Sequence, residues 1–118
     1  MPEQHLDSWA ATGYSPNQTI GSVFTIPASS CATTRPNITL RQALDLQGGK
    51  TFCGAREALM RAAVAALLNS AHPAIDYPRS TAQVIADVNS ALASGDRKAM
   101  ITLANQLDRS NNAPCPLN

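Results

Sequence analysis

The sequence has few charged residues, few aromatic residues and no apolar run long enough to cross a membrane. Charged residues make up 14% and aromatic residues 4% of its 118 residues, whereas soluble domains usually carry about 25% charged residues. The nine lysines and arginines are scattered, and the formal net charge is +1. Because nucleic-acid binders cluster their basic residues, no nucleic-acid partner is expected. The most continuous apolar segment has about 15 residues and a membrane-spanning helix needs about 20, so membrane insertion is not expected either.

The sequence also lacks the motifs of common active sites and metal sites. It contains no GxSxG motif, no phosphate-binding loop and no CxxC pair, and it has only two histidines. Its aspartates do not follow the order of an EF-hand, and no two carboxylates are placed for glycoside hydrolysis. We therefore predict that the protein is not an enzyme and that it uses no metal ion and no cofactor.

One apolar segment organises the expected fold. Residues 54–71 are predicted to form a helix, and between Ala62 and Leu68 no side chain is polar. A helix that is apolar on nearly all sides must be buried on nearly all sides. We therefore expect this helix to be the centre of the domain, with Glu57 and Arg61 forming an i,i+4 pair on its one exposed face.

Capping residues and helical spacing of apolar residues predict three more helices, over residues 40–46, 81–94 and 97–109. The first of them follows Thr39, which forms a capping box with Gln42. Gly95 and Asp96 separate the last two, and such a short connection makes them antiparallel neighbours. The predicted fold class is therefore all-α, with about four helices, of which the central one is buried by the others and by the N-terminal segment.

The first 36 residues have neither helical nor alternating spacing, and they are rich in Ser, Thr, Pro and Asn. We expect residues 1–36 to be a long irregular arm packed on the helical part, 37–118, within one structural domain. Within the arm, residues 21–26 are expected to be extended. Such an arm stays ordered only if isolated apolar residues anchor it in grooves of the helical part.

Three aromatic residues of the arm, Trp9, Tyr14 and Phe24, have two possible uses. They could fasten the arm to the helices, which is the more common role of such residues, or they could contact a sugar or a partner protein. The second use makes them candidate interface anchors.

Polar side chains gather where the central helix is expected to end, and they are Asn69, His72, Asp76 and Tyr77. They form a candidate ligand-binding site. The alternative is that Asn69 and His72 cap the helix end, where backbone carbonyl groups lack partners. The same bridge would serve a small molecule or a carbohydrate.

Three cysteines are present, and an odd number means that one pair leaves a third thiol over. The residues after Met1 do not resemble a signal peptide, so an exported form would have lost its signal. Asn17 and Asn37 each begin an Asn-x-Thr glycosylation sequon. The sequons matter only in a eukaryotic secretory host, and helix capping explains Thr39 equally well.

Several segments taken together resemble a known family: Trp9, TGYSP at 12–16, IGSVF at 20–24, TLRQALDLQGG, AVAALLNSAHPAIDYP, AQVIADVNSALASGDR and LDRSNNAPCPL. As a set they look like a bacterial family of secreted or surface-attached proteins. Its domain opens with a Gly-Tyr-Trp-Lys-Asn-His type motif and closes with an Asn-Asn-x-x-Cys-Pro-Leu type tail. The resemblance covers nearly the whole chain and implies no particular activity. The opening motif is absent here, so the chain would begin just inside the domain.

The resemblance also implies how the cysteines pair. A cysteine before the missing motif would be the partner of Cys115, which would otherwise pair with another chain. Cys31 and Cys53 would then form a disulfide that ties the arm to the start of the central helix, while Cys115 would pin the C-terminal tail.

These features favour a non-catalytic extracellular module, secreted or on the cell surface, that acts through protein contacts. Its partner would be another protein or a second copy of the chain, as in an adhesion or fibre subunit. The alternative is a small-molecule or carbohydrate-binding domain that uses the bridge from His72 to Tyr77.

Overall fold

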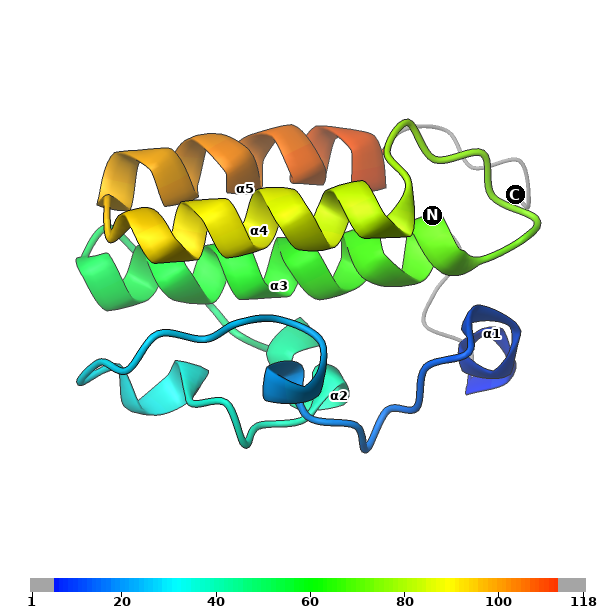
Figure 1. The fold of residues 1–118 in the computed structure, drawn as a ribbon, viewed down its shortest axis with the longest axis horizontal. Helices are drawn as coiled ribbons and strands as arrows, with labels where there is room; N and C mark the ends of the chain where they lie inside the picture. The colour runs from blue at the N-terminus through cyan, green and yellow to red at the C-terminus, as the bar shows by residue number, and fades with distance from the viewer. Residues whose placement is uncertain (1–5, 113–118) are drawn as a thin grey trace.

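A computed structural model describes residues 6–112 of the chain, with side chains from Trp9 onward. Within this range the regular elements are all helical: α1 (Leu6–Thr12), η1 (Ile20–Ser22), η2 (Ala32–Thr34), α2 (Leu40–Leu44), α3 (Phe52–Ala71), α4 (Thr81–Ser94) and α5 (Arg97–Asn111). The all-α prediction is confirmed. The long helices α3, α4 and α5 lie side by side, and the N-terminal segment with α1 and α2 covers the other side of α3 (Figure 1).

Helix α3 is the centre of the fold, as its apolar sequence predicts. It contacts α1, α2, η2, α4 and α5. The side chains of Leu59, Val64 and Leu67 are completely buried. The helix starts two residues earlier than expected, because the Thr51 hydroxyl accepts a hydrogen bond from the Gly54 N–H, 3.0 Å away, and so caps the first turn.

The other three predicted helices are present, and each begins at its predicted first residue. Thr39 and Gln42 form the complete capping box before α2. Ser80 caps α4, and Asp96 caps α5 through the Lys98 N–H. Gly95, which closes α4, has a φ of 64°, a backbone conformation that glycine adopts without steric cost. Two ends differ from the prediction: α2 stops at Leu44 rather than at 46, and α5 continues to Asn111 rather than to 109.

The arm is more structured than predicted. It contains helix α1 and the single-turn helices η1 and η2, and residues 21–26 are not extended throughout because η1 occupies their first positions. Trp9, Ile20 and Phe24 from the arm belong to the same buried cluster as the side chains of α3, α4 and α5. The arm and the helices therefore share one hydrophobic core.

Two segments of the N-terminal half have the same local sequence pattern and pair with each other. Each runs Pro-Asn-x-Thr followed by an apolar residue and a helical turn, once from Pro16 and once from Pro36. Thr19 and Thr39 face each other in an antiparallel bridge. The backbone hydrogen bonds around the bridge are reciprocal: Ile20 N to Ile38 O (2.9 Å) with Leu40 N to Gln18 O (2.8 Å), and Gly21 N to Pro36 O (3.0 Å) with Arg41 N to Pro16 O (3.2 Å). We call this pair, residues 16–24 and 36–44, the twin-turn unit.

Candidate functional site

The candidate ligand site at the end of α3 is centred on a residue that the sequence analysis did not include. The side-chain oxygen of Asn111 accepts hydrogen bonds from Asn69 Nδ2, at 3.1 Å, and from the Tyr77 hydroxyl, at 2.8 Å. Its Nδ2 donates to the carbonyl oxygen of Ala62, 3.2 Å away. Asn69 and Asn111 are 4% and 8% exposed. Asn111 therefore joins α3, the bridge after it and the last turn of α5.

The remaining two residues of the predicted site do not reach this cluster. The Nδ1 atom of His72 accepts a hydrogen bond from the Ala74 N–H at 3.1 Å, and the His72 N–H binds the Leu68 carbonyl at 3.0 Å. The backbone of His72 thus closes the end of α3, whereas neither its side chain nor that of Asn69 donates to a helix carbonyl as the alternative proposed. Asp76 is exposed to solvent. The structure therefore brings together two of the four candidate residues, Asn69 and Tyr77, through Asn111.

Burial raises the pKa of the Tyr77 hydroxyl to about 12, and the positive charge of Arg79 opposes that rise only in part. The hydroxyl therefore stays protonated at any physiological pH and donates a hydrogen bond to Asn111. Burial also raises the pKa of Asp108, which the Arg61 charge opposes.

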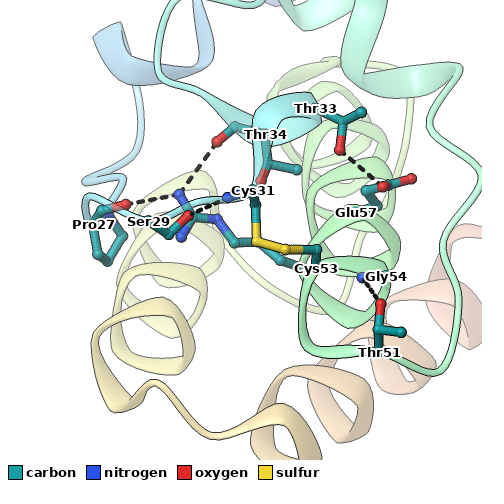
Figure 2. Close-up of a disulfide and its surroundings, with 10 residues drawn as sticks. Pro27, Ser29, Cys31, Thr33, Thr34, Thr51, Cys53, Gly54 and Glu57 are labelled. Atoms are coloured by element: carbon teal, nitrogen blue, oxygen red, sulfur yellow. Dashed lines mark hydrogen bonds between the residues drawn. A yellow bond between two sulfur atoms is a disulfide. The ribbon is translucent and has the colours of Figure 1, made fainter.

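A second group of polar residues lies at the other end of α3 and fastens the arm. Cys31 and Cys53 form a disulfide, with their Cα atoms 5.3 Å apart, between the start of η2 and the first turn of α3 (Figure 2). This is the pairing that the resemblance implied. Cys115 and the tail after Asn112 lie outside the described residues.

Arg56, only 3% exposed, lies beside the disulfide and holds two backbone carbonyls of the arm. Its Nη2 donates to Pro27 O at 2.8 Å and to Thr34 O at 3.2 Å. Burial lowers the pKa of this guanidinium, because the charged form loses contact with water. Pro27 lies in an irregular segment and Thr34 ends the single-turn helix η2, so Arg56 supplies a donor where the backbone has no regular partner.

Glu57 and Arg61 do not form the predicted ion pair. The ion pairs found among the described residues are Arg41–Asp45 and Arg79–Asp87. Glu57 accepts from the Thr33 hydroxyl at 2.8 Å (Figure 2) and from the Gly48 N–H at 3.2 Å. Arg61 Nη1 donates to Leu46 O and Gln47 O at 3.0 and 2.8 Å. The prediction failed because the arm and the 46–48 loop cover this face of α3 and supply closer partners.

The three aromatic residues of the arm pack against the chain's own core. Trp9 and Phe24 are 4% and 2% exposed, and Tyr14 is half-buried. One large apolar side chain in the described part of the chain remains exposed, that of Phe52 at the start of α3, at 38%.

Among the side chains that the structure describes, those of residues 9–112, no three of His, Cys, Asp or Glu lie close enough together to hold a metal ion. Over the same range, no helix has the length and apolar character needed to cross a membrane.

Comparison with known proteins identifies a family. The family model of the Protodermal factor 1 C-terminal domain, a plant family, matches residues 4–114. No curated protein and no solved structure matches the chain. The match shows that the expected bacterial family was wrong: that expectation combined short motifs, whereas the family model spans residues 4–114.

Proposed function

The chain belongs to the Protodermal factor 1 C-terminal domain family, and we propose that it is a non-catalytic extracellular module. The module is secreted or on the cell surface, and it works through protein contacts. The observation that carries this proposal is the fastening of the arm. A disulfide and the side chains of Arg56 and Glu57 connect α3 to the arm at and beside η2, and Arg61 connects α3 to the loop after α2. Such cross-links favour a durable part that keeps its shape outside the cell.

The extracellular location is supported by the disulfide. Disulfides form and persist in the secretory pathway and outside the cell, and they are rare in the cytosol. The Cys31–Cys53 disulfide joins an arm residue that is 2% exposed to the first turn of the central helix. Its position in the shared core indicates a structural bond.

Action through protein contacts is supported by the composition of the chain. A net charge of +1 and a charged fraction of 14% give little electrostatic repulsion between copies, and proteins close to zero net charge associate readily. The exposed Phe52 adds an aromatic side chain, a type enriched in protein interfaces. Self-association is therefore the contact to test first.

The test is the molar mass of the purified chain, measured by light scattering on a sizing column over a series of concentrations. We expect the mass to rise from that of one chain to that of two or more, and Phe52→Ser to shift the rise to higher concentrations. Ala93→Ser, a change at an exposed position of α4, is the matched control. A mass of one chain at every concentration would count against self-association.

A small-molecule or carbohydrate-binding domain is the second candidate. Asn69 and Tyr77 donate hydrogen bonds to Asn111, so a ligand at this site would have to compete with these internal bonds. We therefore favour the contact module.

A further inference from the structure

The twin-turn unit contains both Asn-x-Thr sequons of the sequence. They are Asn17-Gln18-Thr19 and Asn37-Ile38-Thr39, and neither has proline at its middle position. The other asparagines of the chain are not followed by Ser or Thr two positions later. Both sequons therefore lie in the one structural unit that is repeated.

The two asparagines have equivalent surroundings. Each follows a proline in a turn, two residues before the threonine of the bridge, and each is exposed. Within the described residues, no hydrogen bond engages the side-chain amide of either one; the Asn17 contact to Ser15 Oγ uses the backbone N–H. Because the paired segments are antiparallel, Asn17 and Asn37 lie at opposite ends of the unit. Both amides are thus free to carry a large group without displacing packed atoms.

We propose that Asn17 and Asn37 are both N-glycosylated. In each transfer the side-chain amide nitrogen forms a bond to the anomeric carbon of an oligosaccharide supplied as a polyisoprenoid-diphosphate ester. The bond between that carbon and the diphosphate oxygen breaks, its electron pair leaves with the diphosphate, and the amide loses one proton. No oxidant or reductant is needed.

The plant family and the disulfide both support this modification. Plants are eukaryotes and carry the secretory machinery that glycosylates such sequons, and the Cys31–Cys53 disulfide indicates passage through that pathway. This inference rests on the extracellular location proposed above. The turns lie on the arm side of α3, opposite α5 (Figure 1), so the sugars would shield the arm and leave α4 and α5 open to a partner.

The experiment uses the whole chain, secreted from a plant cell line behind an added signal peptide. We expect two steps of reduced gel mobility, both removed by a peptide N-glycosidase that converts each modified asparagine to aspartate and so marks it for mass spectrometry. Asn17→Gln and Asn37→Gln should each remove one step, and the double variant both. Thr39→Ser keeps the sequon and the capping hydroxyl, and Asn105→Gln changes an exposed asparagine outside a sequon; both should keep two steps.

A secreted, disulfide-bonded chain in which either Asn17 or Asn37 is unmodified overturns the proposal. The natural protein, isolated from its own tissue, separates this failure from failure of the proposed location. Unmodified asparagines together with an intact disulfide would refute glycosylation alone. Unmodified asparagines together with free Cys31 and Cys53 thiols would refute the extracellular location as well.

Discussion

Removing the disulfide between Cys31 and Cys53 should lower the free energy of unfolding by about 3 kcal/mol. The bond closes a loop over a sequence separation of 22, and on the chain-entropy model a loop of this length restricts the unfolded chain by about that amount. Domains of this size are stable by about 5–15 kcal/mol. The entropy of unfolding, about 2.1 cal/mol/K per residue, converts the loss into a fall of roughly 12 °C in Tm.

The measurement compares the oxidised chain with a Cys31→Ala, Cys53→Ala variant, both carrying Cys115→Ser so that no third thiol can exchange. Circular dichroism follows the helices, and fluorescence of Trp9, the one tryptophan of the chain, follows the arm. Because Trp9 lies in the common core, the two signals should change together in both proteins. The oxidised chain treated with a reductant should resemble the variant.

Two results would refute this reasoning. A Tm that stays within about 2 °C of the oxidised value would mean that the unfolded chain is already restricted without the bond, since a loss of 3 kcal/mol predicts a much larger change. A Trp9 transition well below that of the helices would mean that the arm unfolds separately and that the core is not shared.

Three other changes test the core, the contact at the start of α3 and the polar cluster. Leu67→Ala should cost about 2–5 kcal/mol in chemical denaturation because the side chain is completely buried, whereas Leu67→Met should cost less than about 1.5 kcal/mol. Gly54→Ala should cost about 1–3 kcal/mol, because its Cβ would lie 2.6 Å from the Gly49 backbone; Gly49→Ala, which meets ordinary contacts, should leave stability unchanged or up to about 1 kcal/mol higher. For Tyr77, the unfolded chain loses the hydroxyl proton near the ordinary pKa of 10.0 and the folded chain near 12, so the folded state binds more protons in between and its stability falls as the pH rises through this range. Tyr77→Phe should remove that part of the pH dependence and the late step of tyrosinate absorbance; an unchanged slope would contradict it.

The four predicted helices were recognisable because their signals are local. The two residues of the capping box, Thr39 and Gln42, are close in sequence, and the apolar run of α3 is one continuous segment. Helix α1 was missed because a helix of seven residues is not stable by itself and depends on tertiary contacts. The burial of Trp9 in the common core supplies these tertiary contacts, and no local sequence pattern predicts them.

The polar cluster could be predicted only in part for the same reason. Asn69 and Tyr77 are close in sequence, but their common partner, Asn111, lies 42 residues after Asn69. The prediction also ended α5 at 109, two residues too early, which removed Asn111 from any helix face. The twin-turn unit, by contrast, left a readable signal: the same Pro-Asn-x-Thr pattern at Pro16 and Pro36. A search for internal repeats would have found it.

The charged face of α3 shows why an irregular arm can cover a central helix. The stretches between the short helices of the arm leave carbonyl groups unpaired, and burying them without donors is costly. Arg56 donates to two carbonyls of the arm, those of Pro27 and Thr34, and Arg61 donates to two of the loop after α2, those of Leu46 and Gln47. The polar side chains at the start of α3 therefore supply the donors that the covering segments need. Neutralising Arg56 would leave two of these carbonyls without their donor, so the polar residues of α3 are as necessary to the fold as its apolar ones.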